Sequence, residues 1–386
     1  MIVYDLEVYQ NLFLFVGYHT EKDKTIIVEL SSRKWESDLL IELAKYCYNQ
    51  QLPLVGFNNL NYDGPMLEYI LSLLINSNLS NDKILSKVKS KSDELVTSKS
   101  KYPPKYNLGI PQIDLMRINR FDVQMISLKY LMFALRVLNV QELPFHHTAV
   151  LTDEEIDVVI NYCKNDITTT IKLYESSKDK IDMRNQLNLE YSKNFITKDD
   201  AQLGEEIFLL ELEKEMDCER NNFKKVDKGI LISFKDLIFD YIKFESKEFN
   251  LLLNWLKDVQ TIEIKGCLNS LEYEKLKSLE GYYKEKKVKG KQDYFNILYK
   301  GNEIVYGVGG VHFSTEGSFI SDDENMILDV DVEAMYPSLS ISNQFYPSQF
   351  GLSFCNVYSN LKEKRKSYPK TNPLNTAIKL SMNSVL

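Results

Sequence analysis

The sequence predicts an α/β fold that is divided into two or three domains. Three observations lead to this prediction. The chain opens with strand-like segments, short apolar strands and amphipathic helices then alternate, and the 386 residues exceed the size at which a single core usually stops growing. With 44% hydrophobic and 26% charged residues, the composition is that of an ordinary globular protein.

The first predicted element is a strand over residues 2–8. Because alternate residues of a strand share a face, Asp5 and Glu7 point to one side while Leu6 and Val8 point to the other. Two carboxylates on an apolar strand are costly to bury unless a cation lies between them, and a divalent cation with oxygen ligands meets that need. The alternative is an edge strand with both acids in water, and the strand alone does not decide between the two.

The next segments continue the α/β pattern. Asp63 is predicted to be the N-cap of a helix with Pro65 in its first turn, directly after a short buried strand. An acid at this junction fits either a simple cap or a pocket that collects acids at strand ends. In this part of the chain, the elements predicted after the first strand are strands at 11–18, 25–30 and 52–57 and helices at 37–50 and from 63 onward.

The polar stretch 76–105 is predicted to be a flexible insertion. Its lysines, and those of the run 284–291, could supply a local basic surface for a phosphate backbone, although a solvated loop is the better explanation of each run by itself. A strand at 111–115 and a helix at 127–139 follow the insertion.

Thr152 and Glu155 form a capping-box pattern, which predicts that a helix begins here. Tyr162 and Asp166 are four residues apart and therefore lie on one face of this helix, at the margin of its apolar stripe. They fit either a solvated rim or a further metal ligand with a partner that orients water.

The second half carries fewer chemical signals. Residues 180–300 are predicted to be rich in helix, with amphipathic stretches at 203–213 and 234–256. The glycine-rich run that contains Tyr306, Gly309 and Gly310 lets the backbone approach a ligand closely. A second acid-bearing strand is predicted at 326–332.

Composition sets limits on location and partners. The net charge of −8 governs solubility and does not exclude a nucleic-acid partner, which needs only a local basic surface. Five scattered cysteines without a Cys-x-x-Cys pair indicate free thiols in a reducing compartment and argue against a zinc module. No apolar run reaches the length of a membrane span, so a cytoplasmic protein without a membrane partner is expected, in the host cytoplasm if a phage encodes it.

Four separated motifs together resemble the family B DNA polymerases, especially the phage-type members. Asp5-x-Glu7, Asn59-x-x-Tyr62-Asp63 and Tyr162-x-x-x-Asp166 are similar to the three motifs of the proofreading exonuclease. Residues 331–338 resemble polymerase motif A, and 379–384 resemble the start of motif B. The resemblance implies an RNase H-like 3′→5′ exonuclease domain over 1–180, a mainly helical connecting region over 181–300, and a partial α+β palm with the start of the fingers over 301–386.

The resemblance also implies roles for the exonuclease residues. Asp5, Glu7 and Asp166 are expected to hold one metal ion and Asp5 with Asp63 a second, with Tyr162 orienting water. Asn59 and Tyr62 are expected to contact the end of a single-stranded primer. Mg²⁺ is the expected ion at both positions, and Mn²⁺ is a substitute.

For the polymerase half, the resemblance implies a metal ligand at Asp331, a steric gate under the deoxyribose at Tyr336, and contacts from Lys379 and Asn383 to the incoming nucleotide. Tyr306, Gly309 and Gly310 are expected to contact DNA. The family places further Asp ligands beyond motif B, so this chain is not expected to extend a primer-template by itself. A separate C-terminal polypeptide could complete it for dNTP binding.

Two other functions compete with this one. The chain could be a non-catalytic DNA-binding or assembly subunit of a split polymerase, with the acids serving as caps and surface charge. A ribonuclease of the same architecture is disfavoured because it would not need the motif A segment.

Overall fold

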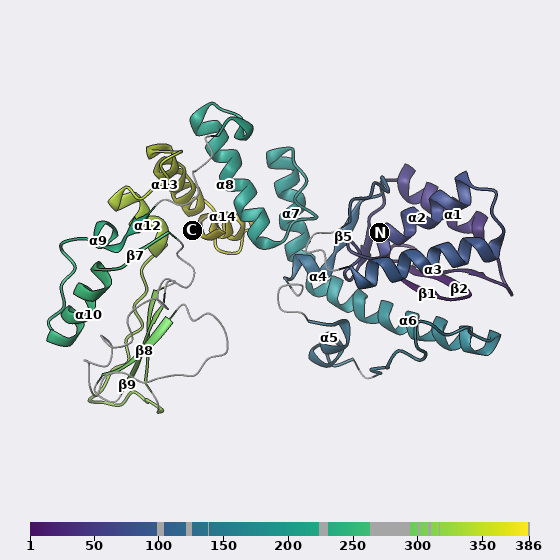
Figure 1. Cartoon of the computed structure of the whole chain (residues 1–386), viewed down its shortest axis with the longest axis horizontal. Coiled ribbons are helices and arrows are strands. Elements are labelled where there is room, and N and C mark those ends of the chain that lie inside the picture. Colours follow the sequence, from purple (N-terminus) through teal and green to yellow (C-terminus); the bar gives the residue numbers. More distant parts are fainter. Residues whose placement is uncertain are drawn as a thin grey trace. The chain divides into compact units, whose positions relative to one another are not determined.

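The structure, a computed structural model, describes residues 1–98, 104–120, 126–137, 139–223, 231–262, 294–299, 302–307, 310–315 and 317–384. The chain divides into two units (Figure 1). The first contains Met1–Asn222 and Ala334–Leu386, and the second contains Phe223–Glu333. The predicted domain boundaries after residues 180 and 300 stay predictions.

A five-stranded mixed sheet forms the centre of the first unit. Its strand order is β3-β2-β1-β4-β5, in which β1, β2 and β3 are antiparallel neighbours while β4 runs parallel to β1 and β5 parallel to β4. The strands are β1 (Ile2–Tyr9), β2 (Leu12–His19), β3 (Lys24–Ser31), β4 (Leu54–Gly56) and β5 (Gln112–Asp114). The predicted strands are confirmed, and the opening strand is the middle strand of the sheet.

Helices cover both faces of this sheet, and the alternation of β1 supplies both cores. Tyr4 and Leu6 pack into the core beneath α1, α2 and α3, whereas Val3 and Tyr9 pack into the core beneath α6. In Figure 1, α1, α2 and α3 lie on one side of β1 and β2, and α6 lies on the other. These helices are α1 (Ser37–Asn49), α2 (Asp63–Asn76), α3 (Asn81–Thr97) and α6 (Asp153–Ser176).

The prediction of a flexible insertion at 76–105 is wrong, because α3 occupies most of it. Ile84, Leu85 and Val88 are buried in the core on the α1 and α2 side of the sheet. These apolar residues recur at helical spacing, but the lysines and serines between them conceal the pattern in a simple hydropathy scan. Residues 99–103 lie outside the described part of the chain.

The C-terminal helices fold onto the same unit as the sheet. Helix α8 packs closely on α14 at Gly204, where an added Cβ would lie 2.4 Å from Ser384 Oγ and 2.6 Å from the Leu380 carbonyl oxygen. The ring of Phe208 on α8 lies 5.0 Å from that of Tyr358 on α13. The remaining helices of this unit are α4 (Leu115–Ile118), α5 (Leu128–Ala134), α7 (Lys178–Tyr191), α8 (Asp200–Met216), α12 (Met335–Asn343), α13 (Leu352–Lys366) and α14 (Pro373–Ser384), with a short 3₁₀ turn at Arg220–Asn222.

The second unit contains short helices and two small antiparallel sheets. Strands β6 and β7 form one sheet, and β8, β9 and β10 form a three-stranded meander. The elements are β6 (Ile232–Ser233), α9 (Phe234–Leu237), α10 (Lys247–Lys257), β7 (Gln260–Thr261), β8 (Tyr294–Tyr299), β9 (Asn302–Gly307) and β10 (Gly310–Ser314).

Two predictions in the second half are corrected. The amphipathic stretch 234–256 is not one helix, because Ser246 accepts a hydrogen bond from Phe249 N at 3.4 Å and starts α10 as a new helix. The predicted strand at 326–332 is not a strand in the structure, and Leu328, Val330 and Val332 are exposed there. A strand needs a neighbour to pair with, and no described strand pairs with this segment. The helix predicted at 203–213 is confirmed by α8.

Cys47, Cys163, Cys218 and Cys355 are free thiols, and Cys267 lies outside the described residues. Among the helices of the described segments, none combines the length and apolar character that crossing a bilayer requires.

Candidate metal centre

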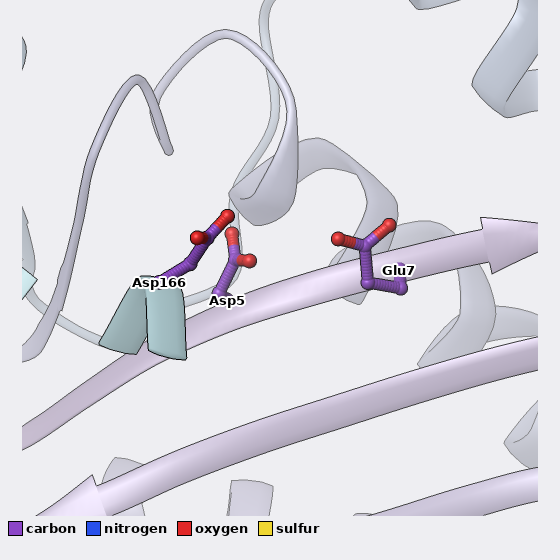
Figure 2. Close-up of side chains that lie close together, drawn as sticks. All are labelled: Asp5, Glu7 and Asp166. Atoms are coloured by element: carbon purple, nitrogen blue, oxygen red, sulfur yellow. The ribbon is translucent and has the colours of Figure 1, made fainter. Parts of the chain in front are cut away.

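Asp5 and Glu7 project from the same face of β1. The face carrying Leu6 and Val8 is buried under α1, α2 and α3, so the two acids are turned toward α6. Figure 2 shows both carboxylates rising side by side from the strand. The prediction from strand alternation is confirmed, and the strand is central, so the alternative of a wet edge strand is wrong.

Asp166 reaches the same place from α6. One carboxylate oxygen from each of Asp5, Glu7 and Asp166 lies within 4.8 Å of the others. Figure 2 shows Asp166 directed toward Asp5. Among the residues that the structure describes, this is the one group of three acidic, histidine or cysteine side chains so closely placed.

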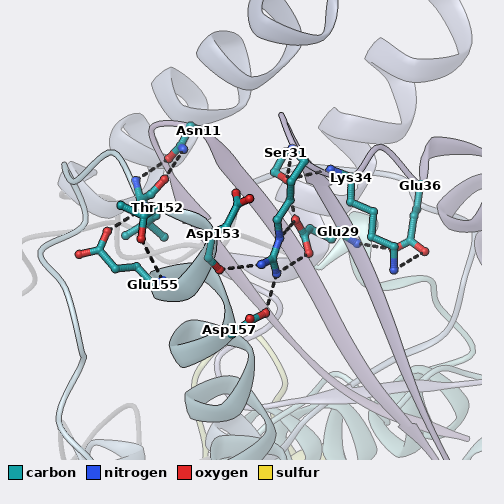
Figure 3. Close-up of polar contacts among 11 residues, drawn as sticks. Asn11, Glu29, Ser31, Lys34, Glu36, Thr152, Asp153, Glu155 and Asp157 are labelled. Carbon is teal, nitrogen blue, oxygen red and sulfur yellow. Dashed lines mark hydrogen bonds and ion pairs between the residues drawn. The ribbon is translucent and has the colours of Figure 1, made fainter.

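The start of α6 explains why Asp166 faces the sheet. Thr152 Oγ1 accepts a hydrogen bond from Glu155 N, and the Glu155 carboxylate accepts from Thr152 N, so the predicted capping box is confirmed (Figure 3). Asn11 holds Leu151, the residue before Thr152, by donating to its carbonyl at 2.8 Å and accepting from its backbone N at 2.9 Å. Asp166 follows roughly four turns later on the same helix.

Asp63 joins the centre from the start of α2, but not as a cap. The N-cap is Tyr62, Asp63 is the first helical residue, and the predicted capping role is wrong. Its Oδ1 instead accepts a hydrogen bond at 3.1 Å from the backbone N–H of Leu6, the residue between Asp5 and Glu7. Since Asp63 is buried, this bond fixes a fourth carboxylate beside the acids of β1.

The charges of these acids oppose one another. Burial and the nearby Asp166 raise the pKa of Asp5 to about 7. Burial raises the pKa of Asp166 to about 6, although the neighbouring Tyr162 hydroxyl and the charge of Lys129 act in the opposite direction. For Glu7 and Asp63, burial and then the charge of Asp5 hold each pKa well above its usual range.

Two further residues touch the centre. Tyr162 lies one turn before Asp166 on α6, and burial together with that carboxylate raises the pKa of the phenol. The Cys163 thiol lies 3.5 Å from Asp5 Oδ2, a contact that sequence reasoning missed because Cys163 fits the apolar stripe of α6. Its position three residues before Asp166 was the one available signal.

The donor set fits hard divalent cations. All four acids supply carboxylate oxygens, which are ligands of Mg²⁺ and Mn²⁺. Asp166 Oδ1 is buried and has no hydrogen-bond partner in the described chain, which leaves an acceptor free for an ion. Repulsion among the acids supplies the electrostatic reason for a cation, since Lys129 is the one cation that acts on Asp166.

The two residues predicted to contact DNA near this centre differ in exposure. Asn59 is fully buried and donates to Gln112 Oε1 at 2.9 Å, so its side chain reaches no surface in this structure. Tyr62 is half-buried, and its hydroxyl lies 2.7 Å from Ser92 Oγ on α3.

The residues predicted for polymerisation belong to both units. Asp331 is exposed in the second unit, whereas Tyr336 on α12 and the exposed Lys379 and Asn383 on α14 belong to the first. Lys379 and Asn383 are one helical turn apart and share a face. Tyr306 is buried in β9, Gly310 begins β10, and Gly309 lies outside the described residues.

Of the comparisons with known proteins, only the one with solved structures found a match. No protein-family model matches it, and no curated protein matches its sequence. The solved structures similar to it include the family B DNA polymerase from the hyperthermophilic archaeon Pyrobaculum calidifontis, with a TM-score of 0.43 and 12% sequence identity. That similarity covers 99% of this chain and 46% of the polymerase, so the chain spans less than half the length of the protein it resembles.

Proposed function

We propose that residues 1–180 form a metal-dependent 3′→5′ exonuclease of RNase H-like architecture that acts on single-stranded DNA ends. The observation that carries the proposal is the meeting of Asp5, Glu7 and Asp166 within 4.8 Å, with Asp63 bonded to the backbone between the first two. The sheet supports it, since three antiparallel strands followed by two parallel ones agree with that architecture.

In this proposal the acids hold two divalent ions. Asp5, Glu7 and Asp166 hold one, and Asp5 with Asp63 holds the other. When bound, such a pair supplies an activated water and stabilises charge on the leaving oxygen. Asp63 can offer its Oδ2 because Oδ1 is occupied by Leu6 N–H.

Tyr162 acts on the water from the side of α6. Asp166 lies one turn away on the same helix, and the raised pKa of the phenol keeps it protonated at neutral pH. A protonated phenol can both donate to and accept from a water molecule, which suits it to orient the attacking water. Tyr62, beside Asp63, is the remaining candidate for stacking on a terminal base.

We further propose that the chain corresponds to the N-terminal part of a family B DNA polymerase, including part of its palm. Residues 181–300 then serve as a connecting region and 301–386 as a partial palm with the start of the fingers. Asp331, Tyr336, Lys379 and Asn383 are proposed to bind metal and nucleotide only once that palm is complete, and Tyr306, Gly309 and Gly310 to contact primer-template DNA. The alternative is a non-catalytic assembly subunit of such a polymerase.

The test is a nuclease assay on a single-stranded oligonucleotide labelled at its 5′ end, with Mg²⁺, with Mn²⁺ or with a chelator. The wild-type chain should shorten the DNA from its 3′ end only when a metal is present. Asp166→Asn should lower the rate by more than about 100-fold, the upper end of the cost of losing an outer-shell partner of a metal. Glu175→Gln is the matched control, an exposed carboxylate on the same helix.

Two results would contradict the nuclease assignment. If the wild-type chain binds the oligonucleotide but leaves it intact with both metals, the non-catalytic alternative stands. If Asp166→Asn and Glu175→Gln cleave equally well, the activity comes from elsewhere.

A further inference from the structure

The loop that carries Asp63 into the centre is tightly folded. Residues 57–62 connect β4 to α2 and turn back over the end of β4, so closely that a Cβ on Gly56 would lie 2.7 Å from Asn59 Cβ. Asn58 takes a left-handed backbone conformation with φ at 65°. Asn is one of the few residues that adopt this conformation at little cost, and contacts outside the loop fix the position of the turn.

Asp114 supplies those contacts. It is the last residue of β5 and lies opposite Gly56 in the parallel register. Its Oδ1 accepts from Asn58 N at 3.0 Å and its Oδ2 from Leu60 N at 3.2 Å. The same carboxylate accepts from Met116 N at 3.0 Å and Arg117 N at 3.3 Å, which caps α4. One buried side chain therefore joins the loop to the first turn of another helix.

Gln112, two residues earlier on β5, fastens the same loop to the central strand. Its Oε1 accepts from Asn59 Nδ2 at 2.9 Å and from the Tyr4 hydroxyl at 3.1 Å. Tyr4 directly precedes Asp5, and all of these groups are buried. Gln112 on β5 thus fixes the position of the loop relative to β1.

We propose that Asp114 is a positioning residue for the metal centre, acting through the loop 57–62 on Asp63. The inference rests on the proposed nuclease function and deepens it. The chain of contacts runs from Asp114 to Asn58 and Leu60, along the loop to Asp63, and from Asp63 to Leu6 N–H. Asp114 makes no hydrogen bond to the four acids of the centre, but its charge acts on Asp63 and raises the pKa of that carboxyl, so Gly56→Ala, which keeps this charge, is needed to isolate the path through the loop.

The discriminating variant is Asp114→Asn. The carboxylate uses one oxygen for Asn58 N and the other for Leu60 N, whereas an amide replaces one oxygen by an NH₂ group, which cannot accept from the backbone N–H that it faces. The control is Asp199→Asn, which removes a carboxylate cap from α8, where Asp199 accepts from Gln202 N at 2.8 Å. Because both variants replace a carboxylate at a helix start by an amide that still caps, the comparison separates positioning by Asp114 from the general effect of losing a negative charge at a helix N-terminus.

Gly56→Ala is a second route to the same loop that leaves Asp114 intact. Its Cβ would displace Asn59. If Asp114→Asn is too unstable to purify, Gly56→Ala carries the test alone.

Three measurements are made on the full chain: amide hydrogen exchange at Asn58 and Leu60, Mn²⁺ affinity by paramagnetic line broadening, and kcat and KM on a single-stranded oligonucleotide. Asp114→Asn and Gly56→Ala should speed exchange at both amides, weaken Mn²⁺ about tenfold and lower kcat by roughly 10-fold to 100-fold with little change in KM. Asp199→Asn should change none of the three.

The outcomes separate this inference from the nuclease proposal. Faster exchange with unchanged Mn²⁺ affinity means that Asp114 holds the loop without positioning the centre, and the inference is overturned. Unchanged exchange overturns it as well. If the wild-type chain binds Mn²⁺ and cleaves nothing, the nuclease proposal fails, while the effect of Asp114→Asn on Mn²⁺ affinity still decides the inference.

Discussion

Asp5 is subject to opposing influences. The Cys163 thiol and the Leu6 backbone lower its pKa, whereas burial and Asp166 raise it, and the second pair prevails. A carboxyl with a raised pKa takes up a proton more readily in the folded chain than in the unfolded one. This property makes the stability of the metal-free protein depend on pH in a direction opposite to that of a salt-bridged acid.

The first prediction follows from that dependence. Unfolded carboxyl groups titrate near pH 4, whereas Asp5 and Asp166 titrate at about 7 and about 6 in the folded chain. Between pH 4 and 7 the folded state binds more protons, so the contribution of these acids to the free energy of unfolding falls as pH rises. Thermal unfolding in a chelator should show this fall in the wild type and a smaller one in Asp5→Asn/Asp166→Asn.

Metal binding should reverse the effect. Mn²⁺ at pH 7.5 should raise the Tm of the wild type, since an ion that binds only the folded state stabilises it, and should leave the double variant unchanged. In the chelator experiment, Tm curves of the wild type and the double variant that run parallel with pH would show that the acids do not repel one another in the folded chain.

Local and distant causes explain which residue roles were predictable. Asp5 and Glu7 were expected on one face because strand alternation is a local rule. The resemblance implied that Asp63 is a metal ligand, but its hydrogen bond from Leu6 N–H was not predicted, because that partner is 57 residues away in sequence and an acid in the first turn suits a helix whether it caps or not. Asp114 was likewise seen only as part of a strand.

At the scale of elements, α3 and the segment 326–332 show opposite errors. In α3, the buried apolar residues are interspersed with polar ones, so the composition resembles that of a loop, and packing against the core stabilises a helix there. In 326–332, residues with strong strand propensity remain unpaired and exposed, because propensity cannot supply a neighbouring strand. Elements with caps written into the sequence, such as α6, were located well.

The second prediction tests whether α3 is part of the core. Ile84→Ala should lower the free energy of unfolding by about 2–5 kcal/mol, the usual cost of emptying a buried isoleucine site. Urea denaturation measures this change. Lys83→Ala, at an exposed position on the same helix, should stay within about 0.5 kcal/mol of the wild type. Equal effects of the two substitutions would mean that α3 is not packed on the sheet.

At the scale of the whole molecule, the first unit is built from two separate stretches of chain. Helices α13 and α14 pack on α8, which follows the sheet in sequence, while Phe223–Glu333 forms the other unit. Sequence patterns do not predict a division of this kind, because it depends on which helix faces pack together and not on where helices begin.

The third prediction is that the first unit folds without the second. Replacing Phe223–Glu333 by a flexible Gly/Ser linker of about 25 residues should leave cooperative thermal unfolding and the proposed nuclease activity in place. Replacing Ala334–Leu386 instead should lower the Tm, because it exposes Phe208 and the other buried residues of α8. The reverse order of stabilities would mean that the division is wrong.

The fastening of α6 at its first turn has a consequence for how this protein can change in evolution. Asn11 holds Leu151, and Arg33 donates to the Asp153 carbonyl at 2.6 Å and to Asp157 at 2.8 Å, so the rotation of the helix about its axis is set where it begins. Each residue turns an α-helix by about 100°. One residue inserted between 153 and 165 would swing Asp166 away from Asp5, whereas insertions in the connection before Leu151 would leave its direction intact. Length variation should therefore be tolerated ahead of this helix and selected against within it.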